Sequence, residues 1–415
     1  MVEQRGPLWG RLIGFTLLPA IAAISPLLVL PVVARIAGPG GWASAIAGES
    51  VGTVAAIVIG YGWTAIGPAL VSIAADSTER ARIYRESLVV RLLIAVAALP
   101  VTAVLCWFVA HPGSEWLSVL MGLQGALIAL SFTWYSAGEG LPRAIMLYDA
   151  IPRLVVAVAA ALLILQVRIV ELYPLSGIAV TLVGTGLFSW RVLRRNPSPW
   201  PRVSELPALF RAGAPVALND AGLGAYSSIP TPLVNITASA SVAGGFASGD
   251  KMLKLGQFLP LTLANALQAW IGEVHGPVRR RRTERALLAH GVFGVLGWIV
   301  LGAAGAWASS FLFGADVAAS TAVCVVLGLT FAFFSVRTSM TRHVLFPAGQ
   351  TRAVMHATLI GTLIGVPIMV VLAVTIGPLG AAIGYAVTEG AATILLVRRS
   401  REALRALSAP PAATP

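Results

Sequence analysis

The stretch Arg194-Arg195-Asn196-Pro197-Ser198-Pro199-Trp200-Pro201-Arg202 divides the chain of 415 residues near its middle. It is polar, basic and rich in proline, whereas long apolar segments precede and follow it. Proline breaks helices, and basic residues mark the cytoplasmic loops between membrane spans. Six apolar segments lie on each side of the stretch. The sequence therefore predicts two six-helix bundles joined by a cytoplasmic linker.

The composition is that of a polytopic membrane protein. Mean hydropathy is +0.84 and only 11% of the residues are charged, whereas a soluble domain has about 25% charged residues. Apolar segments of roughly 20 residues, each long enough to cross a bilayer, recur along the chain. The net charge of +12 does not indicate nucleic-acid binding, because the arginines cluster at the ends of these segments.

Twelve membrane spans are predicted, and Pro215, Pro230 and Pro232 interrupt the seventh. The spans are residues 11–34, 44–73, 87–110, 115–137, 143–166, 171–193, 207–237, 241–273, 286–309, 317–341, 353–376 and 379–398. With the N-terminus in the cytoplasm, 25 of the 29 basic residues fall on the cytoplasmic side of this arrangement. The positive-inside rule therefore places both termini in the cytoplasm.

The predicted domains follow from the spans. They are an N-terminal bundle over residues 1–196, a linker over 197–206, a C-terminal bundle over 207–400 and a disordered tail over 401–415. The first apolar segment has no small-residue cleavage site and is expected to be a retained helix. Cys106 and Cys324 lie in apolar segments without metal-ligand spacing, so neither a metal nor another cofactor is expected.

Three stretches resemble one transporter family, the Wzx-like polysaccharide (O-antigen) flippases of the multidrug/oligosaccharidyl-lipid/polysaccharide exporter superfamily. They are an arginine and a glycine turn after the first span, an aromatic-glycine signature in the fourth, and an aromatic, small, Asp-Lys motif in the eighth. In this chain they read Arg35-Ile36-Ala37-Gly38-Pro39-Gly40-Gly41, Trp134-Tyr135-Ser136-Ala137-Gly138-Glu139-Gly140 and Gly245-Phe246-Ala247-Ser248-Gly249-Asp250-Lys251. Two departures stand out: Gly67-Pro68 replaces an arginine, and Ala137 replaces a glutamine.

The resemblance implies two six-helix bundles around a central cavity. It implies a transporter, not an enzyme, that moves an oligosaccharide on polyprenyl pyrophosphate from the cytoplasmic to the outer leaflet of the bacterial inner membrane. Alternating access, driven by a cation gradient, would perform the movement. Glycosyltransferases and a glycan polymerase are the expected protein partners.

The only two lysines of the chain, Lys251 and Lys254, lie in an apolar segment beside Asp250. Intramembrane charges usually face a protein interior or a watery cavity. Asp250 and Lys254 are four residues apart and share a helix face, and two ammonium groups suit a pyrophosphate. The alternative is an ion pair at a helix end, with the lysines extending to the membrane surface.

Further polar residues are candidate ligands of the sugar and the phosphate. Asn219 and Asp220 lie in the seventh span, and Asn265 and Gln268 share a helical stripe with Lys254 in the eighth. Their alternative role is hydrogen bonding between helices. Arg35 could meet phosphate or anchor at the headgroups. Three acids are candidates for ion coupling or, alternatively, for helix capping: Glu49, Asp149 and Glu389.

Two other functions compete with the flippase. A cation-coupled drug exporter would share the two-bundle fold but would require an acidic, aromatic site. A membrane polymerase or ligase would require a large outer loop, and the predicted outer loops are short. The run Arg279–Arg282 is expected to fix topology and bind anionic lipids.

Overall fold

The structure, a computed structural model, describes residues 8–406, with the side chains of residues 8–24, 219, 223 and 269 outside the description. All regular elements in this described part are helices. A backbone in hydrocarbon must satisfy its own hydrogen bonds, and a helix does so within one segment. The predicted all-α class is thereby confirmed.

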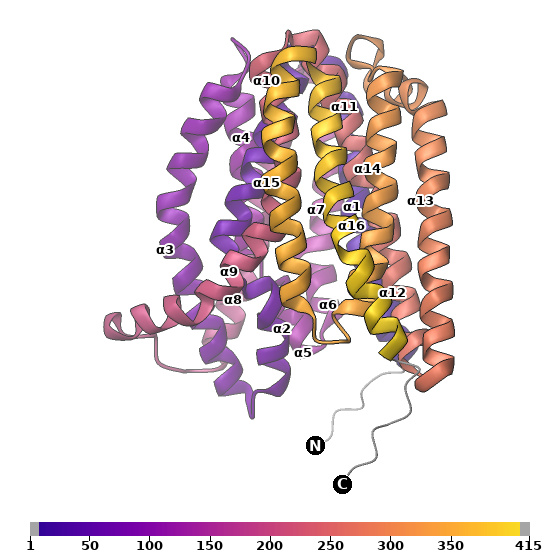
Figure 1. Cartoon of the computed structure of the whole chain (residues 1–415). Helices are drawn as coiled ribbons and strands as arrows, with labels where there is room; N and C mark the ends of the chain where they lie inside the picture. Colours follow the sequence, from indigo (N-terminus) through magenta and orange to yellow (C-terminus); the bar gives the residue numbers. More distant parts are fainter. Residues whose placement is uncertain (1–7, 407–415) are drawn as a thin grey trace. The chain divides into compact units, whose positions relative to one another are not determined.

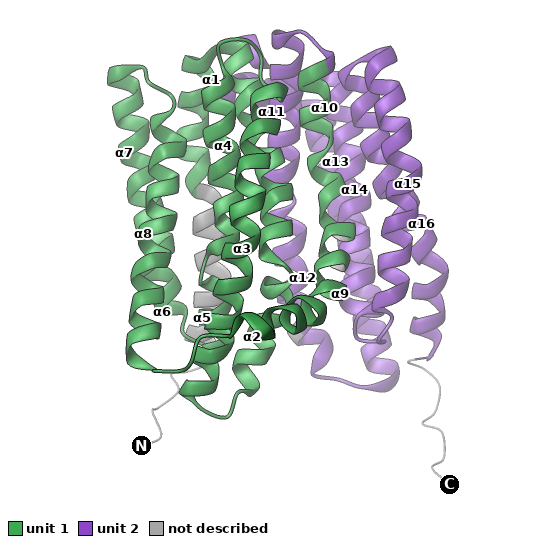
Figure 2. Ribbon diagram, turned by 90° about the vertical axis from the view of Figure 1, so that its left-hand side faces the viewer, with its two compact units in different colours: residues 1–236 green, residues 237–415 purple. Residues whose placement is uncertain are grey.

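The chain forms two compact units, residues 1–236 and 237–415 (Figure 2). The helices that follow the proline-rich loop pack with the first unit up to Ile236. The sequence assigns those helices to a second bundle that begins at residue 207, and this division remains a prediction.

The described part of unit 1 contains ten α-helices and several short 3-10 or π segments. They are α1 (Leu8–Gly60), α2 (Trp63–Ile73), α3 (Ser77–Val109), α4 (Glu115–Leu127), 3-10 helix η1 (Ile128–Leu130), α5 (Thr133–Glu139), α6 (Pro142–Ile145), π-helix η2 (Met146–Ala150), α7 (Ile151–Val167), α8 (Leu172–Arg195), 3-10 helix η3 (Val203–Glu205), α9 (Leu206–Gly224), 3-10 helix η4 (Ala225–Ser228) and α10 (Pro230–Thr237).

Unit 2 contains longer and less interrupted helices. They are α11 (Ala240–Gly256), α12 (Phe258–Gly272), α13 (Gly276–Phe313), 3-10 helix η5 (Ala315–Val317), α14 (Thr321–Ser339), π-helix η6 (Met340–Leu345), α15 (Thr351–Ile376) and α16 (Pro378–Ala406). Helices α15 and α16 pack along each other, as do α13 and α14 (Figure 1).

Nine helical stretches of the described part are long and apolar enough to cross a membrane. The first of them covers the first two predicted spans, because α1 comprises two helices that meet at a kink at Gly38, whose non-helical φ of 68° suits glycine. The seventh and eighth predicted spans correspond to broken helices, α9 with α10 and α11 with α12. These three differences account for nine stretches where the sequence predicts twelve spans.

The break between α1 and α2 is fixed by contacts with α9. Tyr61 and Gly62 both have positive φ, 46° and 76°, and a non-glycine residue rarely adopts this conformation. The Tyr61 hydroxyl donates to the Phe210 carbonyl oxygen at 3.0 Å, and the two rings meet edge to face. A tyrosine with this backbone is therefore held by the start of α9.

Exposed tryptophans lie near both ends of the membrane helices in unit 1. Trp107 and Trp116 lie on either side of the loop between α3 and α4, and their rings meet edge to face. At the opposite end, Trp190 lies in the last turns of α8 and Trp200 follows it. Tryptophan is enriched at both membrane–water interfaces. This spacing matches a unit that crosses the bilayer.

Candidate substrate site and intramembrane ion pairs

The segment with both lysines forms α11, which begins unit 2. Lys254 Nζ lies 2.7 Å from Asp250 Oδ2, so the ion pair suggested by the spacing is present. The Asp250 side chain is 0% exposed and that of Lys254 is 27% exposed. Lys251 is 7% exposed. The buried acid therefore holds an ammonium group that still reaches the surface of the protein.

Small residues bring α11 close to its neighbours. A methyl group on Gly245 would lie 2.7 Å from the Ala318 carbonyl oxygen, and one on Gly249 would lie 3.0 Å from Leu327. These glycines are one helical turn apart and share the face that packs on η5 and α14. Packing thus explains the glycines of the Asp-Lys motif. Its charged residues, Asp250 and Lys251, directly follow the second of these glycines.

The polar stripe predicted along the eighth span is divided between two helices. Lys254 lies on α11, whereas Asn265 and Gln268 lie on α12, after the break at Gln257. Asn265 and Gln268 are exposed. The Asn265 side-chain oxygen accepts a hydrogen bond from Arg342 Nη1. Asn265 therefore makes an interhelical hydrogen bond, the alternative considered from sequence.

The candidates in unit 1 are less closely grouped. Arg35 is exposed on α1, one turn before the kink at Gly38, and Asp220 is half-buried on α9. The side chain of Asn219 lies outside the described residues. Arg35 and Asp220 thus lie on two different helices of unit 1.

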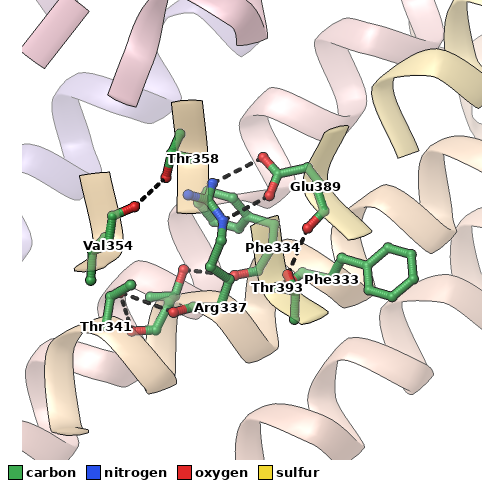
Figure 3. Close-up of polar contacts among 9 residues, drawn as sticks. Phe333, Phe334, Arg337, Thr341, Val354, Thr358, Glu389 and Thr393 are labelled. Atoms are coloured by element: carbon green, nitrogen blue, oxygen red, sulfur yellow. Dashed lines mark hydrogen bonds and ion pairs between the residues drawn. The ribbon is translucent and has the colours of Figure 1, made fainter. Parts of the chain in front are cut away.

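Glu389 is paired with an arginine that the sequence analysis counts only as a cytoplasmic charge. Arg337 Nε donates to Glu389 Oε2 at 2.9 Å, and Nη2 donates to Oε1 at 3.0 Å (Figure 3). The side chain of Glu389 is 1% exposed and that of Arg337 is 11% exposed. Both lie within membrane helices, α16 and α14. This bidentate geometry is the strongest form of a carboxylate–arginine pair.

Asp149 is paired in a similar way inside unit 1. Arg153 Nη2 lies 2.6 Å from Asp149 Oδ1 and 3.5 Å from the Thr181 hydroxyl. Asp149 lies on the π-helix η2, and π-turns occur frequently at functional sites. Arg153 also lines a cavity of about 40 Å³ with Gln124 and Tyr173. This volume holds a few water molecules and excludes a sugar.

The third acid, Glu49, is half-buried on α1. The described residues contain no group of three or more His, Cys, Asp or Glu side chains that could hold a metal ion. Two of the three acids proposed from sequence for ion coupling, Asp149 and Glu389, have an arginine as counter-ion.

One fully buried arginine, Arg91, is not among the candidate site residues taken from the sequence. Arg91 is 0% exposed, and its Nη1 donates to the carbonyl oxygens of Ala129 and Ser131 at 2.8 and 3.0 Å. Those carbonyls lie where the fourth span breaks between α4 and α5. Arg91 therefore satisfies backbone oxygens that a continuous helix would satisfy itself. The position of Arg91 inside a predicted membrane span was the signal in the sequence that this arginine is buried.

The aromatic-glycine stretch of the fourth span forms part of the core of unit 1. Trp134 and Tyr135 are 4% and 1% exposed and pack against Tyr84. A methyl group on Gly67 would collide with the Trp134 ring. The glycine that replaces the family's arginine in α2 is therefore matched by the indole that occupies its space.

Comparison with known proteins supports the family resemblance. No protein-family model matches the chain. A Shigella dysenteriae protein described as "Putative O-antigen transporter" is 20% identical over 343 residues, which cover 82% of this chain and 86% of that protein.

Solved structures show the same fold. The lipid II flippase MurJ in an inward closed conformation matches with a TM-score of 0.73 and 11% identity, over 95% of this chain and 89% of that one. An inward-facing multidrug-resistance MATE transporter matches with a TM-score of 0.64 and 16% identity. The match covers 94% of this chain and 98% of that one. The chain therefore has the fold of these transporters, and its similarity to the putative O-antigen transporter supports the resemblance to the polysaccharide flippases.

Proposed function

We propose that the protein is a flippase that moves a polyprenyl-pyrophosphate-linked oligosaccharide from the cytoplasmic to the outer leaflet of the bacterial inner membrane. Alternating access is the proposed mechanism. One relative in sequence is described as a putative O-antigen transporter, and one protein of similar structure is a lipid II flippase. Both names concern lipid-linked glycans, and they support the substrate class that the sequence motifs indicate.

The observation that carries the proposal is the charge of α11. Two ammonium groups, Lys251 and Lys254, accompany one carboxylate, Asp250, so the segment has a net positive charge. A charge in a low-dielectric interior interacts far more strongly than one in water. A positive segment at membrane depth therefore favours an anionic ligand, and the pyrophosphate is the anionic part of the proposed substrate.

The ion pair also explains how such a ligand could be released. Lysine binds phosphate as a mobile point charge, without the planar fork of arginine. When the pyrophosphate leaves, Asp250 provides Lys254 with a carboxylate at 2.7 Å. The ammonium group thus exchanges one anionic partner for another instead of remaining unpaired. This exchange lowers the free-energy barrier to release in either conformation of the transporter.

The MATE likeness favours a drug exporter as the second candidate. An exporter of cationic drugs requires a site with net negative charge, because burial of one cation beside others is unfavourable. The charge of α11 opposes that function. In unit 1 the acid Asp149 is neutralised by Arg153, which leaves less negative charge for a cationic drug.

One experiment separates the two candidates. The purified protein is reconstituted into vesicles that carry a polyprenyl-pyrophosphate oligosaccharide in the inner leaflet, and arrival of the glycan outside is followed with an added glycosidase. The same protein is expressed in a drug-sensitive strain. We expect glycan exposure without drug resistance. Resistance to cationic drugs without glycan exposure would instead identify the exporter.

A further inference from the structure

Two buried histidines that the sequence analysis does not consider face each other in unit 2. The ring centroids of His290 on α13 and His343 on η6 are 5.7 Å apart. The residues are 0% and 2% exposed. In the part of the chain that the structure describes, neither ring is hydrogen-bonded to a carboxylate. Histidine is the side chain that normally titrates near neutral pH, and ionisable residues within membrane helices are usually functional.

The hydrogen bonds define the protonation of each ring. His290 Nδ1 lies 3.0 Å from the Ser335 carbonyl oxygen, which can only accept, so Nδ1 carries the proton. His343 Nε2 lies 3.0 Å from the Ala264 carbonyl oxygen, so this ring is protonated at Nε2. Its Nδ1 then accepts from the Ser339 hydroxyl at 2.9 Å. In their neutral forms the two rings are therefore opposite tautomers.

We propose that His343 is a proton-binding site and that the added proton binds at Nδ1. The Ser339 hydroxyl can accept from an Nδ1–H group after rotation, and a helical serine can then donate to the carbonyl four residues earlier, that of Ser335. Both nitrogens of the imidazolium would thus retain partners. His290 lacks this capacity, because its Nε2 has no hydrogen-bond partner. The pair therefore accepts one proton, at His343.

The charged groups around η6 favour release of this proton. Arg342 of the same turn is bonded to Asn265 of α12, and its positive charge opposes a second cation beside it. Arg337 of α14 is paired with Glu389 of α16. On α15, Arg352 and His356 are exposed, and α13 contributes His290.

Three acids of the helices, each in an ion pair, are less suited to bind a proton. Asp149, Asp250 and Glu389 have basic partners at 2.6, 2.7 and 2.9 Å. Protonation of any one of them would leave an arginine or lysine without its counter-ion, which is costly in a buried site. Protonation of a neutral histidine separates no ion pair.

A proton at His343 would act on the helix that continues from the proposed substrate segment. Arg342 and His343 bind two consecutive residues of α12, Asn265 and Ala264. A hydrogen bond from an imidazolium is about twice as strong as one from a neutral ring. Protonation therefore tightens the attachment of α12, and loss of the proton loosens it. Coupling of this change to flipping rests on the proposed function.

The proton site can be tested without any transport. Full-length protein with ¹⁵N-labelled histidine rings is titrated by NMR from about pH 8 to about pH 5, the range over which histidine normally changes charge. We expect one buried ring to change from the Nε2–H tautomer to the imidazolium and that signal to be absent from His343→Gln. A ring at His343 that stays neutral across this range would overturn the proposal.

The coupling is tested separately in vesicles with the lipid-linked oligosaccharide. Glutamine can retain the bonds to Ala264 and Ser339 but cannot titrate, so His343→Gln should flip substrate at a rate independent of pH. The wild type should respond by up to about tenfold per pH unit, the limit for one proton. His356→Gln, at an exposed position, is the matched control and should behave as wild type.

A pH response retained in His343→Gln would exclude the coupling. Absence of flipping by the wild type would count against the proposed function, and the NMR titration would still decide the proton site.

Discussion

Arg337 and Glu389 form a two-pronged ion pair between α14 and α16, with nitrogen–oxygen distances of 2.9 and 3.0 Å. The pair lies inside the membrane-spanning part of unit 2, and the carboxylate is 1% exposed. Thr393 Oγ1 also donates to the Glu389 carbonyl oxygen at 2.7 Å, within α16. The charge of Glu389 is therefore balanced by the protein itself, and the pair connects two helices.

Loss of one partner of this pair should destabilise the protein. Glu389→Gln leaves a buried guanidinium without its counter-ion, and the expected cost is about 3–5 kcal/mol. Thermal unfolding of the purified protein, followed by tryptophan fluorescence, should show a lower midpoint. The double variant Arg337→Met/Glu389→Met removes both charges and should recover most of the loss. A Glu389→Gln protein with normal stability and no transport would instead support an ion-coupling role for the acid.

The Asp149–Arg153 pair gives a sharper test of ion coupling in unit 1. If the acid serves only to neutralise Arg153, then Asp149→Asn/Arg153→Gln should preserve transport, because no charge is left unpaired. The single variant Asp149→Asn should be the more damaging change. Transport is measured by complementation of a flippase-deficient strain, with protein amounts checked in the same cells. Complete loss of transport in a well-expressed double variant would show that the carboxylate has a direct role.

Gly67 should tolerate no side chain, because the Trp134 ring occupies the space next to it. Gly67→Ala should lower the yield and thermal stability of folded protein, and Gly67→Arg, with its larger side chain, should abolish folding. Overpacking of a core typically costs about 1–3 kcal/mol. Gly186→Ala is the control, because a methyl group there meets nothing within 4 Å. Equal stability of the two alanine variants would contradict this packing.

The membrane fold was predictable because it depends on the average properties of long segments. Apolar length and arginine placement are sufficient to identify spans. Average hydropathy over a long segment does not reveal where a helix breaks within it. The turn at Tyr61 requires the contact with Phe210, and the kink between the two helices of α1 depends on the non-helical backbone at Gly38.

The site was predictable only where both members of an interaction lie close in sequence. The pair of Asp250 and Lys254 follows from a four-residue spacing on one helix. The pair of Arg337 and Glu389 joins residues 52 positions apart, and sequence alone assigns Arg337 to the positive-inside pattern. Likewise, His290 and His343 become neighbours only through the packing of α13 on η6.

Membrane topology gives a prediction that is independent of the site. Cysteines introduced at Arg82, Arg202 and Arg281 should react with an impermeant maleimide only from the cytoplasmic side. Those at Gly113 and Asp316 should react only from outside. The native Cys106 and Cys324 are buried and should contribute little background. Labelling of the Arg202 position from outside would contradict the placement of both termini in the cytoplasm.

The role of the two lysines requires graded variants. Lys254→Ala should abolish flipping with little loss of folded protein, whereas Lys254→Arg should retain part of it, because the charge survives with a different geometry. Asp250→Asn should weaken transport less than loss of both lysines. Arg168→Ala is a suitable control, because this basic residue ends α7 and lies outside the proposed site.

The most direct measurement of the central claim is surface glycan in a flippase-deficient strain that expresses Lys251→Ala/Lys254→Ala. The variant must be present in the membrane in wild-type amounts. If these lysines bind the pyrophosphate of the substrate, the cells will display no more surface glycan than cells with an empty vector. Full surface glycan in the double variant would contradict the claim that α11 holds the pyrophosphate.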